Sequence, residues 1–228
     1  MENSLEPLNY LQPPRPLTLP PGDAARLDPF ERAHATALQA AFVPETYRFL
    51  PYGPFESAEA FADHRMALAA TGDPIFYTIF AEGRALGIAS YLRINPPQGT
   101  IEIGHIALSP ALQQSRAGTE ALSLMMRWAF DVGYRRVEWK CDALNRASRR
   151  AAQRLGFSFE GIHRQAAISR GRNRDTAWYS VLDGEWAAVG GAHRQWLAAS
   201  NFGPDGAQET RLSALTAPLL AARDPGLA

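Results

Sequence analysis

Two short stretches of the chain hold the polar side chains best suited to chemistry. Glu102 and His105 lie in IEIGHIAL, and Asn145 and Ser148 lie in CDALNRASRR. A carboxylate or a neutral imidazole accepts a proton, whereas a serine hydroxyl both donates and accepts hydrogen bonds. The two stretches therefore hold candidates for general acid–base catalysis, and their geometry depends on the elements that carry them.

Glu102 and His105 fall in a β-branched, apolar run that predicts a strand over 101–108. They are three residues apart, so a regular strand would point them to opposite sides, and only a β-bulge would change this. The ordinary imidazole pKa of about 6.5 suits His105 to deprotonating an ammonium. The alternative for either residue is a hydrogen-bonded polar group in a half-buried strand.

Asn145 and Ser148 are three residues apart at the predicted start of a helix over 145–155. This spacing places both side chains on one side of the first turn. Asn145 also has the residue type of a helix N-cap, and Ser148 could simply bond to its own helix backbone. The residues alone leave these readings open.

A second helix start follows the strand that carries Glu102. The loop 113–117 leads into a helix whose first turn holds Gly118 and Thr119. The first N–H groups of a helix lack internal partners and lie at the positive end of its dipole, so this turn suits a phosphate. Gly118 would let such a group approach the backbone closely.

The remaining patterns predict the framework around these residues. Six prolines lie in residues 1–22 and predict an extended arm, and Asp28-Pro29 resembles the start of a helix that runs to Phe42. Further helices are expected over 57–70, 118–130 and 183–199, and strands over 75–80, 85–94, 136–140, 157–169 and 176–182, followed by a tail over 201–228. The order predicts an α/β (or α+β) domain, with a mixed central sheet of about six to seven strands and helices on both faces.

Three segments resemble the GNAT superfamily of N-acetyltransferases, and its RimJ/RimL (ribosomal-protein-alanine N-acetyltransferase) branch in particular. NRAS followed by LGFSFEG resembles the Asn-x-x-Ser … Gly-Phe-x-x-Glu-Gly signature of that branch, and IEIGHIAL resembles its "EIG" strand. QQSRAG resembles the superfamily's acyl-CoA loop. The resemblance covers about Leu17 to Trp186, and divides the chain into an arm (1–22), a GNAT domain (23–186) and a helical extension with a tail (187–228).

The resemblance implies acetyl-CoA as co-substrate and no metal. In the family the strand that carries IEIGHIAL separates from its neighbour and pairs with the pantetheine arm, and the loop binds the pyrophosphate. The cofactor residues implied here are Ile106, Ala107, Leu108, Gln113, Ser115, Arg116, Ala117, Gly118, Thr119, Asn145 and Ser148.

The implied reaction is direct attack of a primary amine on the acetyl thioester. Ser148 would donate to the departing thiolate, a backbone N–H near Ile106 would meet the oxyanion, and Glu102 or His105 would be the base. The acceptor is a protein or peptide N-terminus or a small amine. The expected acceptor contacts are Tyr47, Tyr52, Asp175 and Trp178.

Two departures from the family pattern concern the site. Arg116 replaces a loop glycine, so the loop is either tighter or uses this arginine on a phosphate. The strand after the "GF" turn reads RQAAIS at 164–169, without the carboxylate that some RimL-like enzymes are thought to use. A non-catalytic acyl-CoA-binding regulator is therefore the alternative function.

Composition and charge narrow the remaining classes. The net charge is zero, and one cysteine, Cys141, excludes an internal disulfide and a cysteine metal cluster. No apolar run reaches membrane length and no signal-peptide pattern opens the chain, which predicts a cytoplasmic protein. Residues 135–174 hold eleven basic and three acidic residues, but without regularly interleaved aromatics nucleic acid is not the expected partner. A homodimer that exchanges the arm and tail is one option left open.

Overall fold

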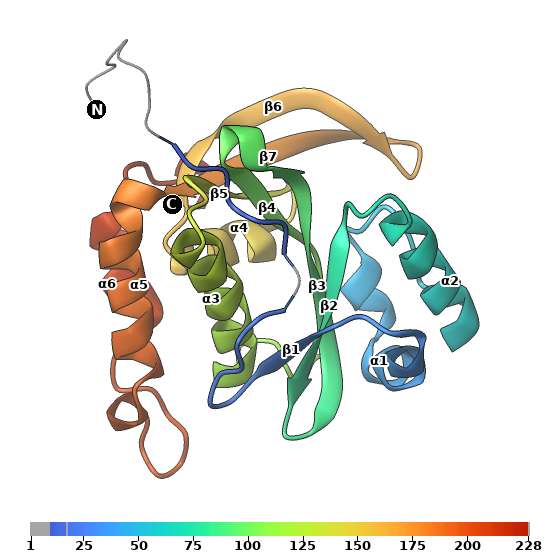
Figure 1. Cartoon of the computed structure of the whole chain (residues 1–228), viewed down its shortest axis with the longest axis horizontal. Coiled ribbons are helices and arrows are strands. Elements are labelled where there is room, and N and C mark those ends of the chain that lie inside the picture. The colour runs from blue at the N-terminus through green and yellow to red at the C-terminus, as the bar shows by residue number, and fades with distance from the viewer. Residues whose placement is uncertain (1–9, 17, 228) are drawn as a thin grey trace.

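The computed structural model describes residues 10–16 and 18–227 and consists of one seven-stranded sheet with helices on both faces (Figure 1). The strands are β1 (Arg26–Pro29), β2 (Ile75–Ala81), β3 (Arg84–Asn95), β4 (Thr100–Leu108), β5 (Arg136–Asp142), β6 (Ser158–Ser169) and β7 (Arg172–Leu182). The helices are α1 (Ala35–Ala41), α2 (Ala58–Ala69), α3 (Arg116–Asp131), α4 (Arg146–Arg154), α5 (Asp183–Leu197) and α6 (Leu212–Thr216). The predicted fold class is confirmed.

The sheet has the strand order β1-β2-β3-β4-β5-β7-β6, and its one parallel pair is β4 with β5. Helices α1 and α2 cover one face, and α3 to α6 cover the other (Figure 1). Each face has its own apolar cluster. Ile101, Ile103, Val137 and Trp139 belong to the cluster under α3, whereas Phe61, Phe76 and Ile88 belong to the cluster under α1 and α2. Strand alternation therefore divides the polar residues between the two faces.

One predicted element is wrong at the N-terminus. Residues 26–29 form β1, antiparallel to β2, whereas the sequence predicts that a helix begins at Asp28-Pro29. The helix α1 begins only at Ala35, after a turn of 3₁₀ helix at Arg32–His34. Proline is compatible with this strand because β1 lies at the edge of the sheet.

The N-terminal arm is extended but packs against the body. Pro13, Pro16 and Leu19 are buried, although no helix or strand begins within residues 10–16 and 18–25. The buried carboxylate of Glu120 on α3 anchors the end of the arm. It accepts the backbone N–H groups of Asp23, Ala24 and Ala25 at 3.1, 2.6 and 2.7 Å.

We predict that Glu120→Ala lowers the free energy of unfolding by about 2–3 kcal/mol, because one buried and two partly buried backbone donors lose a charged acceptor. Denaturant unfolding measures this change. Asp23→Asn is the matched control, since no side chain in the described part of the chain bonds to the Asp23 carboxylate. Equal stability of the Glu120 variant and the wild type would contradict an anchoring role.

The C-terminal residues also pack on the body. Within 201–227, the segment predicted as a tail, the chain forms α6 and buries Leu212, Thr216 and Asp224. Helix α5 begins at Asp183, so the boundary placed between residues 186 and 187 falls inside one helix.

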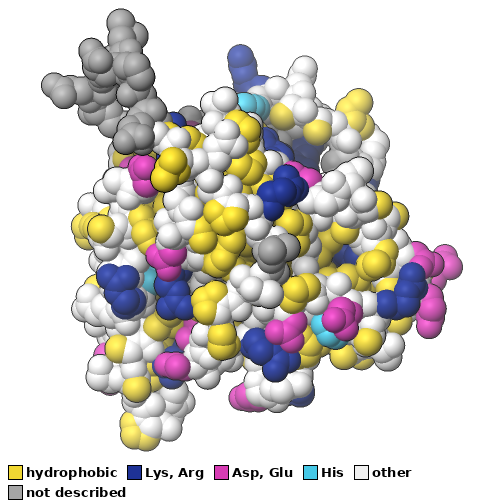
Figure 2. Space-filling view, in the orientation of Figure 1, with side chains coloured by type: hydrophobic (Ala, Val, Ile, Leu, Met, Phe, Trp, Pro, Cys, Tyr) yellow, Lys and Arg dark blue, Asp and Glu magenta, His cyan; other side chains and the backbone are white. Residues whose placement is uncertain are grey.

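Charged side chains are dispersed over the surface. On the face shown in Figure 2, basic and acidic side chains are interspersed with apolar ones, several of them next to a side chain of opposite charge, with no continuous basic area. Several arginines of the basic span 135–174 are neutralised by carboxylates: Arg136 pairs with Glu138 and Glu160, and Arg149 pairs with Asp224. None of the described helices is long and apolar enough to cross a membrane.

Candidate active site

The parallel strands β4 and β5 separate after a short paired segment. Their pairing joins residues 100–102 to 136–138 and ends at Glu102 and Glu138, although β4 continues to Leu108 and β5 to Asp142. Over residues 103–108 the β5-facing edge of β4 therefore has no strand partner. Backbone groups along this unpaired edge of β4 are suited to pair with an extended ligand. The family resemblance implies such pairing for Ile106, Ala107 and Leu108.

A β-bulge in β4 lies beside this opening. Ser90 of β3 pairs with Gly104 and Ile88 pairs with Ala107, so His105 and Ile106 have no partners in β3. His105 has the left-handed φ of +49°. The extra residue restores His105 to the α1–α2 face, where its ring lies 5.3 Å from that of Phe76. Glu102 alternates with Ile101 and Ile103 and lies on the same face. The opposite orientation expected for a regular strand is corrected by the bulge.

The Glu102 carboxylate is 2% exposed and lies between two cations. Its Oε2 atom is 3.4 Å from Arg93 Nε and 3.4 Å from Lys140 Nζ, but accepts no hydrogen bond in the described structure. Burial raises the pKa of Glu102 to about 7, and the two cations only partly oppose this shift. A carboxyl group with this pKa is suited to accept a proton near neutral pH.

Trp178 forms the wall beside Glu102. Its ring lies 4.6 Å from the Arg93 guanidinium and 5.3 Å from Lys140 Nζ, so it holds both cations that flank the carboxylate. The indole Nε1 is buried and has no hydrogen-bond partner among the described residues. Sequence reasoning placed Trp178 near the acceptor but missed Arg93 and Lys140. The only sequence signal for Lys140 was its position two residues after Glu138, which places both side chains on the same face of β5.

His105 is surrounded by aromatic side chains. Its Nδ1 atom is 2.6 Å from the Tyr52 hydroxyl, and the two rings stack with centroids 5.7 Å apart. Burial first, and then the positive charge of Arg65, lowers the pKa of His105 to about 4. The imidazole is therefore neutral at pH 7, but is a weaker base than the ordinary value of about 6.5 suggests.

The other expected acceptor residues lie at different depths. Tyr47 is 2% exposed, and its hydroxyl donates to Gln39 at 3.3 Å. Asp175 accepts the backbone N–H of Gln165 at 2.8 Å and the Asn173 side chain at 2.9 Å, at an irregular point of the β6–β7 hairpin. The structure thus brings Tyr52 to His105 and Trp178 to Glu102. The side chains of Tyr47 and Asp175 instead bond to Gln39 and to the β6–β7 hairpin, respectively.

The β6–β7 hairpin closes over this side of the sheet. From its tip, Arg170 donates to the carbonyl groups of Tyr52 and Gly53 at 2.7 and 2.6 Å. Figure 1 shows the hairpin extending toward the α2 side of the sheet. No pattern in the sequence identified Arg170, because its partners are backbone atoms about 120 residues earlier.

Ser148 lies on the opposite face, beside β5. Its hydroxyl oxygen accepts the indole N–H of Trp139 at 3.0 Å, which leaves the hydroxyl hydrogen available to another acceptor. Asn145 is the N-cap of α4, since its Oδ1 atom accepts the Ser148 N–H at 3.1 Å. Burial raises the pKa of the neighbouring Cys141 thiol to about 11, so this thiol is protonated.

The N-terminus of α3 offers backbone donors to an anion. The hydroxyl of Ser115 caps the helix by accepting the Gly118 N–H at 2.9 Å, and the Thr119 N–H bonds to the Ser115 carbonyl. In the described structure the N–H groups of Arg116 and Ala117 have no acceptor. A glycine is required at 118 because a Cβ there would lie 2.3 Å from the Leu112 carbonyl oxygen.

Two side chains of the loop turn away from this helix end. Arg116 donates to the Leu197 carbonyl of α5 at 2.7 Å and lies 5.0 Å from the Phe202 ring. Its guanidinium thus joins the loop to the C-terminal extension, whereas the sequence left open a contact with phosphate. The Gln113 side chain donates back to the Leu108 carbonyl at 3.0 Å.

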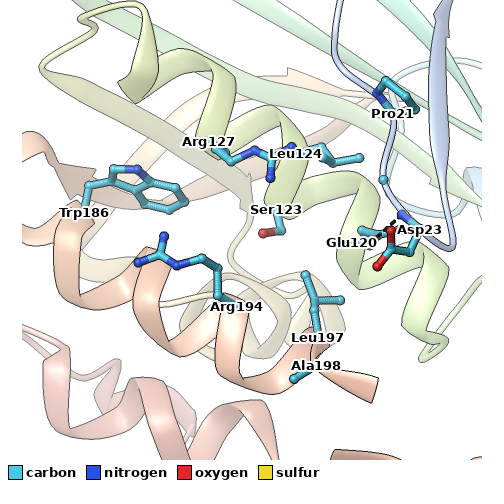
Figure 3. Close-up of a pocket in the computed structure, with 12 residues that line it drawn as sticks. Pro21, Asp23, Glu120, Ser123, Leu124, Arg127, Trp186, Arg194, Leu197 and Ala198 are labelled. Carbon is cyan, nitrogen blue, oxygen red and sulfur yellow. Dashed lines mark hydrogen bonds between the residues drawn. The ribbon is translucent and has the colours of Figure 1, made fainter. Parts of the chain in front are cut away.

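Two surface hollows lie away from the β4–β5 opening. One, of about 260 Å³, lies between α3 and α5, where Arg127 and Arg194 line one part and Asp23 and Glu120 another (Figure 3). The other, of about 710 Å³, is lined by α1 and the β2–β3 turn. Neither includes Glu102, His105 or Ser148. No cluster of three or more metal-ligating side chains occurs within residues 10–16 and 18–227.

Comparison with known proteins agrees with this geometry. Residues 25–158 match the acetyltransferase (GNAT) domain family. A GCN5-related N-acetyltransferase from Brucella melitensis is 39% identical, with a TM-score of 0.87 over 92% of this chain and 99% of that one. A probable GNAT-family acetyltransferase from Chromobacterium violaceum ATCC 12472 is 40% identical, with a TM-score of 0.78 over 82% and 98%.

A structure of RimL, the ribosomal L7/L12 α-N-protein acetyltransferase, in complex with coenzyme A is 24% identical, with a TM-score of 0.59 over 72% of this chain and 97% of that one. This likeness concerns the fold. The search of the curated proteins found no match. The family match and the two closely similar structures show that the chain belongs to the GNAT family of acetyltransferases.

Proposed function

We propose that the chain transfers the acetyl group of acetyl-CoA to a primary amine at the point where β4 and β5 separate. The observation that carries this proposal is the division of polar residues between the two faces of the sheet. Glu102 and His105 lie on the α1–α2 face, and Ser148 lies on the face of α3 and α4. Between these residues the pairing of β4 with β5 ends, beyond Glu102 and Glu138.

The face of α3 and α4 fits coenzyme A. The free N–H groups of Arg116 and Ala117 suit its pyrophosphate, and the unpaired edge of β4 suits the amide groups of its pantetheine arm. The side-chain nitrogen of Asn145 is directed by the capping bond of its oxygen and is the expected donor to that arm. When bound, acetyl-CoA supplies an acetyl thioester, the activated acyl group of the reaction.

The other face fits an amine. Glu102 accepts the proton that the ammonium must lose, directly or through a water molecule, and Lys140 and Arg93 stabilise the carboxylate form. The backbone N–H of Ile106, at the bulge where the register between β3 and β4 shifts, is the proposed donor to developing negative charge on the acetyl oxygen. Tyr52 and Trp178 border the entry of the acceptor, beneath the roof formed by the β6–β7 hairpin.

Ser148 is the proposed donor to the departing thiolate. Trp139 occupies one lone pair of the Ser148 oxygen, and the hydroxyl hydrogen is shared with the neighbouring Cys141 thiol, so a thiolate bound beside Ser148 competes with that thiol for the hydrogen. We predict that Ser148→Ala lowers kcat by about 10²-fold, the lower end of the range for positioned proton donors, and leaves the Kd for coenzyme A within about twofold. Ser213→Ala, on an exposed position of α6, is the control. Loss of coenzyme A affinity with unchanged kcat would instead assign Ser148 to binding.

The acceptor class is tested by an amine panel. Release of free thiol from acetyl-CoA is measured with N-terminal peptides, polyamines and aminoglycosides, each with wild type and Glu102→Gln in parallel. Turnover on one class that is lost in the variant supports the proposed site. Turnover that persists in the variant places the chemistry elsewhere.

A further inference from the structure

A buried arginine lies behind the acceptor side of the site. Arg65, in the middle of α2, has no exposed surface, and its Nε, Nη1 and Nη2 atoms make no hydrogen bond of good geometry among the described residues, although the guanidinium is close enough to the Tyr52 hydroxyl to interact with it. It also forms no ion pair there. Aromatic faces surround the guanidinium instead: its central carbon lies 4.2 Å from the Tyr52 ring, 4.9 Å from Phe61, 5.2 Å from Phe76 and 5.7 Å from Phe55.

Burying an unpaired cation is costly, and contacts with aromatic faces recover only part of that cost. A long apolar side chain would fill the same space between these rings at less cost. The structure therefore points to an electrostatic effect of Arg65 on a neighbouring group. That group is one contact away, since the Tyr52 ring under the guanidinium bears the hydroxyl that lies 2.6 Å from His105 Nδ1.

The charge of Arg65 sets the direction of this hydrogen bond. A cation over the ring face draws electron density from the phenol, which makes the Tyr52 hydroxyl a stronger donor and a weaker acceptor. The same charge disfavours an imidazolium. Both effects favour a Tyr52 hydroxyl that donates to a lone pair on Nδ1 of a neutral His105, which places the ring proton on Nε2.

We propose that Arg65 is a positioning residue that acts through Tyr52 to hold His105 as the neutral tautomer with its proton on Nε2. His105 then presents a hydrogen-bond donor toward the acceptor side and does not serve as the proton acceptor. This leaves that role to Glu102. The inference rests on the proposed acetyl transfer for its use, but the state of His105 itself is measured without either substrate.

The groups around His105 all act in this direction or are neutral. Arg65 and His64 lie on α2, Lys140 on β5, and Tyr52 on the loop before α2. Burial, Arg65, Lys140 and His64 each lower the pKa of His105, in that order. Burial and the Arg65 charge also lower the pKa of His64, whose ring is tilted against that of Tyr52 with centroids 4.6 Å apart, which disfavours a second imidazolium beside His105.

The test is the protonation state of His105 by ¹H–¹⁵N correlation of the imidazole nitrogens, in the full chain without ligands. The signals of His105 are identified among those of the five histidines by their absence from His105→Gln. In the wild type we expect a neutral Nε2–H ring from pH 7.5 down to about pH 5.5. Arg65→Met fills the same space without the charge and is expected to raise the pKa of His105 by about one unit or more. Arg65→Lys keeps the charge and should retain a low value.

Tyr52→Phe is the second variant, which keeps Arg65 and removes the hydroxyl. It is expected to convert the single Nε2–H tautomer into a mixture, and it decides the question if Arg65→Met does not fold. An unchanged tautomer in Tyr52→Phe, or an unchanged His105 pKa in a folded Arg65→Met protein, would overturn the proposal. If the wild type and the variants show the expected His105 signals but the wild type acetylates no amine, only the proposed function is contradicted.

Discussion

Glu102→Gln is expected to lower kcat/KM for acetyl transfer by about 10²–10³-fold, because general-base catalysis contributes about that much and the amide cannot accept the proton. The size of the effect follows from the position of the carboxylate. Glu102 is the last residue of β4 that pairs with β5. It is 2% exposed and is flanked by Arg93 and Lys140. Steady-state kinetics with saturating acetyl-CoA and a varied concentration of the amine acceptor measures the loss.

The pH profile gives this prediction a second readout. The base form of Glu102 is populated above its folded pKa of about 7, so wild-type kcat/KM should rise with pH through this value. The residual activity of Glu102→Gln should lack that ionisation. Glu82→Gln, on an exposed turn, is the matched control and should keep the wild-type profile.

For Glu102→Gln we expect stability to change in the opposite direction to activity. The pKa of Glu102 is raised on folding, from an ordinary value of about 4.3 to about 7. The folded state therefore binds more protons than the unfolded state between these values, and stability falls as pH rises through this window. Glu102→Gln should remove that loss and be at least as stable as the wild type at pH 8. A variant that is inactive because it is unfolded would contradict the assignment of Glu102 as the base.

Asp224→Ala is expected to lower the free energy of unfolding by about 3–5 kcal/mol, because it leaves a buried guanidinium without its counter-ion. Arg149 on α4 donates to both oxygens of Asp224, at 2.7 Å from Nε and 2.5 Å from Nη2, and the Tyr179 hydroxyl of β7 also donates to it. The Asp224 side chain has no exposed surface. This pair attaches the C-terminal segment to the helix that begins at Asn145.

The pH dependence of stability tests the same contact. Burial raises the pKa of Asp224, but the hydrogen bonds from Arg149, Tyr179 and Gly226 outweigh it and leave the pKa below its ordinary value. A depressed carboxyl pKa contributes stability above the unfolded value of about 3.9, and that stability is lost as pH falls through the folded value. The Tm of the wild type should therefore fall more steeply below about pH 4 than the Tm of Asp224→Ala.

The control for Asp224 is an exposed ion pair. Asp63 pairs with Arg32 at 2.6 Å, with both side chains more than half exposed, so Asp63→Asn should cost less than about 1 kcal/mol. If Asp224→Ala cost no more than Asp63→Asn, the C-terminal segment would not be anchored as the structure shows. Because Asp224 contacts α4 and not the proposed coenzyme A site, we expect any change in coenzyme A affinity in Asp224→Ala to arise from displacement of α4.

Much of the framework could be predicted from the sequence because its signals are local. The strands over 75–108 and the helices α3 and α4 follow from apolar periodicity and from turn residues, and the family resemblance ordered them into one sheet. The strand β1 was missed because Asp28-Pro29 has the residue types of a helix start. Its pairing with β2 joins residues about 50 positions apart, which no local pattern encodes.

The site was predicted in outline but not in its electrostatics. Glu102, His105, Asn145 and Ser148 were singled out by type and spacing, whereas the bulge that brings Glu102 and His105 to one face depends on the register between β3 and β4. The low pKa of His105 depends first on burial and then on Arg65, 40 positions earlier in the chain, and neither follows from a local pattern. Arg116 could not be separated from a phosphate ligand by sequence, because its partner is a carbonyl group of α5.

The most direct test of the central claim is a single experiment on wild type and Glu102→Gln: calorimetric binding of coenzyme A together with thiol release from acetyl-CoA across the amine panel. We predict that both proteins bind coenzyme A with similar affinity and that only the wild type turns over rapidly, on one class of primary amine. Binding without acetylation of any amine by the wild type would contradict the account and favour an acyl-CoA-binding regulator.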